Sequence, residues 1–135
     1  MKTVLSFLFV FILAGPTIAS NGQGSHIVIT PLAPVFGQFV DFAWNGGGDD
    51  VSFNVTCTAN TSTVPEQPVG TVVLSVFGMV MEDGISQPLT IAMSATANWT
   101  SGGADCSVAA DIFSYSGGSG NYQRKFANAT FVVLP

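Results

Sequence analysis

The sequence predicts an all-β protein, an antiparallel two-sheet β-sandwich of about seven strands. Beyond position 20, glycine and proline interrupt the chain about every ten residues, which is the spacing of short strands. The segments between them are rich in Val, Ile, Phe and Thr, which favour strands. Apolar and polar residues alternate within these segments, and no segment beyond position 20 has a helical period. Two packed antiparallel layers are the expected arrangement for roughly 115 residues of this kind.

Seven strands are expected, at residues 26–30, 39–44, 51–58, 71–81, 89–99, 105–114 and a last strand through 127–133. Pro31 and Pro34 cannot donate backbone hydrogen bonds, so the first strand is expected at a sheet edge. Alternation places an apolar set toward the core: Val40, Phe42, Trp44, Val51, Phe53, Val55, Cys57, Leu89, Ile91, Met93, Ala95, Ala97, Trp99, Cys106, Val108, Ala110, Ile112, Ala127, Ala129, Phe131 and Val133.

The strand at 71–81 is apolar on both faces. One face carries Val72, Leu74, Val76 and Val80, and the other carries Val73, Phe77, Met79 and Met81. A strand buried on one side only should carry polar residues on the other side. The second set is therefore a candidate partner face, which is covered either by a loop of the same chain or by another chain.

The first 20 residues have the pattern of a signal peptide. Lys2 supplies a positive charge, residues 4–14 are apolar apart from one serine, and Gly15-Pro16 precede the small residues Ala19 and Ser20. The apolar run is shorter than the roughly 20 residues that a membrane-spanning helix needs. We therefore expect a signal peptide at 1–20 and one domain at 21–135, secreted to the extracellular space or cell surface, with no membrane span in the mature chain.

The two cysteines, Cys57 and Cys106, allow one internal disulfide. Export to an oxidising compartment favours that bond, and alternation places both residues on inward faces. A disulfide that closes a loop of this length would stabilise the fold by roughly 3 to 4 kcal/mol, if its effect is calculated as the loss of chain entropy in the unfolded state. Two buried free thiols are the alternative.

Composition excludes several classes of function. The chain has three Lys+Arg against eight Asp+Glu and a net charge of -5, so it lacks the basic surface that nucleic acid requires. A single histidine, His26, and two cysteines are too few for a zinc site made of these residues. A hydrolytic triad needs a histidine or another base beside a nucleophile, and His26 lies near the N-terminus of the mature chain, where a solvated residue at the start of a strand is expected. Adjacent carboxylates such as Asp49-Asp50 are more typical of solvated loops than of a catalytic pair. We expect no cofactor and no enzyme activity.

A weak calcium hypothesis rests on Asp49, Asp50 and Asp105. Calcium takes oxygen ligands from loop carboxylates, and the glycine-rich loop 46–50 can fold around an ion. The regular spacing of an EF-hand loop is absent. Solvated turn residues are the alternative interpretation.

Four Asn-x-Ser/Thr sequons begin at Asn54, Asn60, Asn98 and Asn128. Alternation places three of these asparagines on outward faces and Asn60 in a loop, where a glycan could be attached. Asparagine prefers outward positions in any case, and only a host with the required machinery would use the sequons.

Four segments of the sequence follow one another in an order that resembles a known group of proteins. They are Pro34-x-x-Gly37-x-x-Val40-x-Phe42, a strand ending in Cys57, Trp99-Thr-Ser-Gly-Gly-Ala-Asp-Cys106, and Ala127-x-x-x-Phe131-x-Val133. The order resembles small secreted bacterial immunoglobulin-like (Ig-like) domains, and the likeness covers nearly the whole mature chain. The segment 99–106 is its most specific part. The resemblance implies that Cys106 lies on the strand equivalent to F and pairs with Cys57 on the neighbouring strand C.

Two functions follow from this reading. The first is an extracellular module for binding or adhesion, whose loops at 45–50, 59–68 and 116–122 contact a protein or glycan ligand. The second is a structural subunit of a surface filament or layer, in which copies associate by strand addition. The donor strand in that case would be residues 25–30, freed by signal cleavage.

Overall fold

The computed structural model describes residues 17–20, 26–61, 68–82, 85–94, 96, 98–116 and 121–135. These residues form strands β1 (Thr17–Ser20), β2 (His26–Thr30), β3 (Phe39–Trp44), β4 (Asp50–Ala59), β5 (Val72–Glu82), β6 (Ile85–Ser86), β7 (Leu89–Ala92), β8 (Ala104–Ser116) and β9 (Asn121–Val133). No helix of sufficient length and apolarity to cross a membrane occurs among them.

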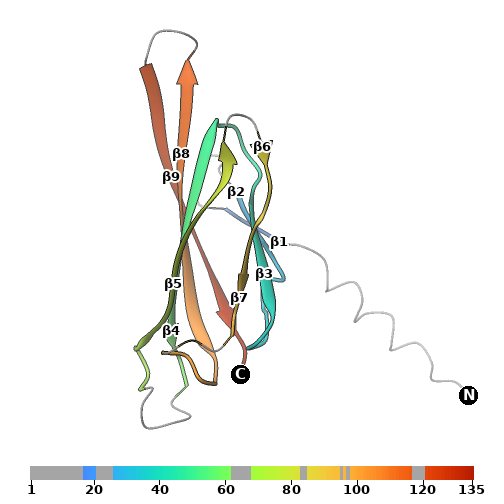
Figure 1. Cartoon of the computed structure of the whole chain (residues 1–135), viewed down its shortest axis with the longest axis vertical. Helices are drawn as coiled ribbons and strands as arrows, with labels where there is room; N and C mark the ends of the chain where they lie inside the picture. Colours follow the sequence, from blue (N-terminus) through green and yellow to red (C-terminus); the bar gives the residue numbers. More distant parts are fainter. Residues whose placement is uncertain are drawn as a thin grey trace, which may run out of the picture.

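The strands form two antiparallel sheets that pack as the layers of a β-sandwich (Figure 1). The four-stranded sheet has the order β1-β2-β3-β7, and the five-stranded sheet has the order β6-β5-β4-β8-β9. The seven predicted strands are β2, β3, β4, β5, β7, β8 and β9, which make layers of three and four. The structure therefore confirms the all-β sandwich, and it adds the short strands β1 and β6.

Strand β2, predicted at the edge of a sheet, lies inside the four-stranded sheet. Strand β2 lies between β3 and β1, because Thr17 pairs with Ile29 and Ser20 with His26. Strand β1 belongs to the segment predicted as a signal peptide, of which residues 1–16 lie outside the described part. Ile27 and Ile29 are fully buried. The described part of the predicted donor strand is thus built into the chain's own core, while Ser25 is not described.

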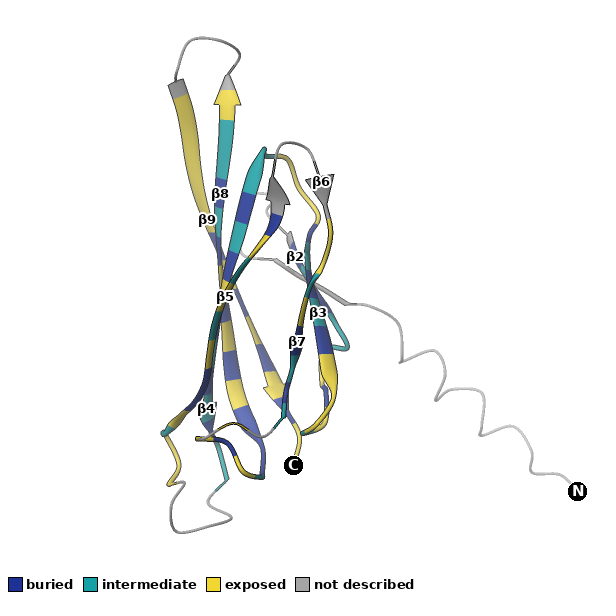
Figure 2. Ribbon diagram, viewed as in Figure 1, coloured by how far each residue is buried: buried dark blue, intermediate teal, exposed yellow. Residues whose placement is uncertain are grey.

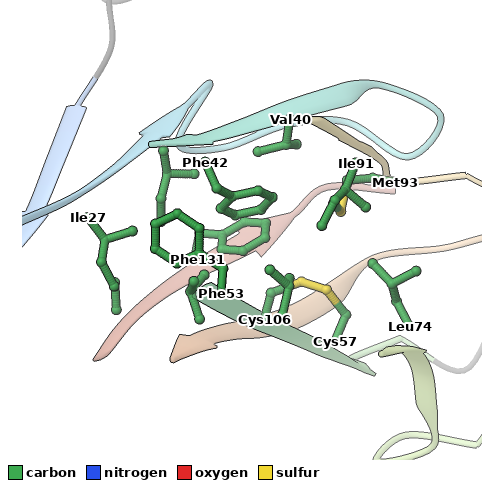
Figure 3. Packing of buried hydrophobic residues seen from close by; sticks show 14 of the residues in the cluster. Ile27, Val40, Phe42, Phe53, Cys57, Leu74, Ile91, Met93, Cys106 and Phe131 are labelled. Carbon is green, nitrogen blue, oxygen red and sulfur yellow. A yellow bond between two sulfur atoms is a disulfide. The ribbon is translucent and has the colours of Figure 1, made fainter. Parts of the chain in front are cut away.

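The core lies between the sheets and is filled by the inward residues of the alternating strands (Figure 3). The ring of Phe42 on β3 lies 5.5 Å from that of Phe131 on β9 and 6.4 Å from that of Phe53 on β4. These contacts join the two layers. Each fully buried side chain of this size contributes roughly 1.5 to 3 kcal/mol to the stability of the fold, because its apolar surface is removed from water.

Cys57 and Cys106 form the predicted disulfide, with an S–S distance of 2.04 Å. They lie directly opposite each other on the adjacent strands β4 and β8, so the bond stays within the five-stranded sheet. Both side chains point into the core (Figure 3). The alternative of two free thiols is wrong.

Trp99 is buried as predicted, but it lies on a loop. Strand β7 ends at Ala92, and the predicted strand 89–99 does not continue. The Thr96 hydroxyl accepts hydrogen bonds from the backbone N–H groups of Asn98 and Trp99, at 3.2 and 3.1 Å. A Thr side chain that takes up nearby backbone donors favours a turn over a sheet ladder. The predicted core residues Ala95 and Ala97 lie outside the described residues.

A β-bulge in β5 changes which of its residues face the core. Cys57 pairs with Leu74 and Thr58 with Val72, so Val73 is an extra residue on β5. Val73 and Leu74 are both buried, whereas Val72 is 48% exposed. The expectation that Val73 belongs to the partner face is therefore wrong, because simple alternation cannot anticipate a bulge.

Candidate binding face on the five-stranded sheet

The outer face of the five-stranded sheet exposes a set of large apolar side chains, which we call the aromatic face: Phe77, Met79, Tyr115, Tyr122 and Phe126. Exposed and buried positions alternate along β9 from residue 127 to residue 133, whereas residues 122–126 are all exposed, as Figure 2 shows. Phe77 and Met79, from the predicted partner face, are 68% and 50% exposed. The described chain therefore leaves them uncovered, against the expectation of loop cover. The side chain of Met81 lies outside the description.

Phe77 and Phe126 stand on either side of two strands with short outward side chains. Phe77 on β5 is opposite Asn54 on β4, and Phe126 on β9 is opposite Asp111 on β8. Strands β5 and β9 are three strand spacings apart, about 14 Å. Between the two rings lies a hollow of about 210 Å³, lined by Ser52, Asn54, Phe77, Ala109, Ala110, Asp111 and Phe126.

A second hollow of about 390 Å³ follows on the same face, toward the disulfide. Its lining is rich in hydroxyl groups and consists of Thr56, Thr58, Asp105, Cys106, Ser107, Thr130, Phe131 and Val132. The two hollows lie in succession along β4 and β8, and we call them together the groove. From Ser52 to Thr58 the groove extends six residues, or about 20 Å.

Arg124 on β9 binds a carboxylate and stacks on two aromatic rings at one end of the aromatic face. Its Nε donates to Asp111 Oδ1 at 2.9 Å and its Nη2 to Asp111 Oδ2 at 2.5 Å. The guanidinium carbon lies 4.8 Å from the ring centre of Phe126 and 5.1 Å from that of Phe113. The hydrogen bonds to the carboxylate raise the pKa of Arg124. The pair neutralises its own charges, and the guanidinium stacks against one wall of the groove.

The predicted calcium ligands do not converge. Asp49 Oδ2 accepts a hydrogen bond from the Tyr115 backbone N–H at 2.5 Å, and Asp50 Oδ2 accepts one from the Tyr115 hydroxyl at 2.7 Å. Asp105 lies beside Thr58, eight residues along β4 from Asp50, or about 27 Å. The three carboxylates cannot share one ion. Within the described residues, no three His, Cys, Asp or Glu side chains gather at a metal site.

Instead, Asp49 and Asp50 attach the start of β4 to Tyr115 near the end of β8. The β8–β9 hairpin extends past Asp50, the first residue of β4, and projects beyond the neighbouring strands (Figure 1). There the Tyr122 ring lies 6.4 Å from that of Tyr115 and 5.7 Å from that of Phe113. The contacts support the aromatic side chains at the projecting end.

The sequon asparagines lie in three different environments. Asn54 and Asn128 are exposed on the same face as the groove, and Asn54 lines it. Asn98 is exposed in the loop before Trp99. Asn60 is half-buried and donates from Nδ2 to Asp105 Oδ1 at 2.9 Å. Glycosylation of these residues stays a prediction.

Tyr122, at the end of the predicted contact loop 116–122, belongs to the aromatic face, and it lies on strand β9. Residues 62–67 and 117–120 of the predicted contact loops lie outside the described residues, as does the side chain of His26. Sequence reasoning missed Tyr115, Arg124 and Phe126 because it followed only the inward residues of the last two strands. The same alternation, continued back from Asn128 to Phe126, Arg124 and Tyr122, contained the signal.

Comparison of the chain with protein-family models, with curated proteins and with solved structures found no significant match to any of them.

Proposed function

We propose that the chain is a secreted, extracellular Ig-like module for binding or adhesion, which acts without catalysis and uses the aromatic face as its contact surface. The observation that carries the proposal is the gathering of Phe77, Met79, Tyr115, Tyr122 and Phe126 on one face of one sheet. Large apolar side chains that are exposed together on one face are a common mark of an interaction site.

The composition of the face supports the proposal. Binding surfaces are enriched in aromatic residues, Met and Arg; the face carries the first two kinds, and Arg124 stacks on its residue Phe126. The Ig-like assignment draws on the placement of β2, β3 and β7 in one layer and β5, β4, β8 and β9 in the other. The disulfide is compatible with export to an oxidising compartment.

The test measures how much of the wild type and of each variant binds to cells and extracellular material of the native culture. Each protein is recovered after expression of the full chain. The Phe77→Ala/Phe126→Ala variant is expected to lose most of the bound fraction. Phe39→Ala is the matched control, since Phe39 is 66% exposed but lies on the four-stranded sheet. Equal losses in the control and the double variant would contradict the proposal.

The alternative is a structural subunit of a surface filament or layer, assembled by strand addition between copies. One observation favours it. Strand β1, which covers the edge of β2, lies within the predicted signal peptide, so cleavage would leave that edge unpaired. Negative-stain electron microscopy of the recovered protein distinguishes the two functions. Filaments or sheets would support the subunit, whereas discrete particles would dismiss it.

A further inference from the structure

We infer that the groove binds a neutral polysaccharide, with the sugar chain lying along β4 and β8 between Phe77 and Phe126. The inference rests on the proposed function as a binding module and names the class of ligand. Three features of the groove support it: its aromatic walls, its polar floor and its lack of net positive charge.

The walls suit the apolar side of a sugar ring. A pyranose presents C–H groups on its faces and hydroxyl groups around its rim. Phe77 and Phe126 are 68% and 64% exposed, and the face of a phenyl ring packs well against C–H groups. Arg124 stacks on Phe126 at 4.8 Å, which holds that ring in place before a ligand arrives.

The floor suits the hydroxyl groups of the rim. The outward side chains along its centre are Ser52, Asn54, Thr56 and Ser107, which supply three hydroxyl groups and one amide. Within the described residues these four side chains hydrogen-bond to no other residue. Their donors and acceptors remain available, and an apolar cleft with a few polar groups is the usual form of a small-molecule site.

The charge of the groove selects against anionic ligands. The permanent cation beside it, Arg124, is already paired with Asp111 through two hydrogen bonds. The other charged group of the lining is the Asp105 carboxylate, and the chain as a whole carries a net charge of -5. A neutral sugar chain meets no repulsion there, whereas a polyanion would.

A second copy of the chain fits the groove less well. Packing two aromatic faces together would bring apolar rings over the floor and remove Ser52, Asn54 and Thr56 from water. A buried polar group without a hydrogen-bond partner costs free energy, whereas sugar hydroxyls would satisfy these groups. Self-association through the face is therefore an outcome that the test must recognise.

The experiment is affinity electrophoresis of the protein, recovered after expression of the full chain, in native gels. The gels contain hydroxyethyl cellulose, xylan, galactomannan or dextran, with polygalacturonate as the anionic comparison. At least one neutral polysaccharide is expected to retard the protein, and polygalacturonate is not. Phe77→Ala and Phe126→Ala should each weaken the retardation about fivefold to tenfold, the equivalent of one aromatic contact. Ser52→Ala should weaken it less, and Phe39→Ala should leave it unchanged.

Several results would overturn the inference. They are retardation by polygalacturonate alone, retardation by none of the polysaccharides, or equal effects of Phe39→Ala and Phe77→Ala. Sedimentation velocity of the wild type and the same variants detects self-association. A wild-type dimer that Phe77→Ala dissociates, with no retardation by any polysaccharide, would assign the face to self-association. Loss of binding to native cells in Phe77→Ala, again without retardation, would refute the sugar ligand and leave the binding module intact.

Discussion

The two sheets of the sandwich have similar inner faces and different outer faces. Inward residues of both sheets are buried and apolar, from Phe42 on β3 to Phe53 on β4. On the outside of β2, β3 and β7, the described large apolar residue with high exposure is Phe39, and the Thr90 hydroxyl donates to Asp41 Oδ1 at 2.6 Å. The outside of the five-stranded sheet carries the whole aromatic face.

This difference separates residues that stabilise the fold from residues available to a partner. Burial accounts for the apolar residues between the sheets, since each removes surface from water. It does not account for Phe77 or Phe126, whose rings remain mostly in solvent. Both sheets face the same solvent, so solubility alone does not explain why one outer face is aromatic and the other is not.

The strongest test of the comparison replaces one phenylalanine on each face of the five-stranded sheet. Phe53→Ala should lower the free energy of unfolding by about 3 to 5 kcal/mol, because it opens a cavity beside Phe42. Phe77→Ala should change it by less than about 0.5 kcal/mol, as exposed positions usually do. Urea unfolding followed by fluorescence measures both. Similar losses in the two variants would show that the aromatic face is part of the stabilising core.

Removing the disulfide tests the inner face of the same sheet. The bond joins residues 49 apart in sequence, and Cys57→Ala/Cys106→Ala should lower the free energy of unfolding by about 2 to 4 kcal/mol. Urea unfolding of the wild type with and without a reducing agent should show a loss of similar size. The double variant is the control, since a reducing agent should not affect it. Retention of binding by the folded double variant would confirm that the outer face works independently of the bond.

A smaller effect is expected at Gly78 on β5, which packs against Leu89 of the other sheet. Gly78 is opposite Phe53, and a Cβ on it would lie 2.5 Å from Leu89 Cδ1 of the other sheet. Gly78→Ala should therefore cost about 1 to 3 kcal/mol by overpacking, although the neighbouring Phe77 and Met79 remain exposed.

A double-mutant cycle with Leu89→Ala measures this contact. Shortening Leu89 removes the atoms that the new Cβ would meet, so Gly78→Ala should cost less in the Leu89→Ala background. Thermal and urea unfolding of the four proteins provide the coupling free energy. If the free-energy changes of the two substitutions simply add, contact with Leu89 is not the reason for the glycine at this position.

The sequence by itself determined the class of fold, the seven main strands and the disulfide. Alternation with period two places Val51, Phe53, Val55 and Cys57 on one side of a strand wherever the strand lies. Two cysteines on inward faces left one internal pairing, which the structure confirms. These properties depend on local pattern and composition, which a single sequence contains.

Tertiary structure decided the rest. The bulge at Val73 depends on how β5 pairs with β4, and the Thr96 hydroxyl fixes the turn before Trp99 against β5 by donating to the Val73 carbonyl at 3.1 Å. Aromatic residues from β5, β8 and β9 form one face only because strand order places them on the same side of one sheet. Asp49 and Asp50 are separated from Asp105 by the length of β4 for the same reason. Pairing between distant segments sets these positions, and no local pattern records which strands will be neighbours.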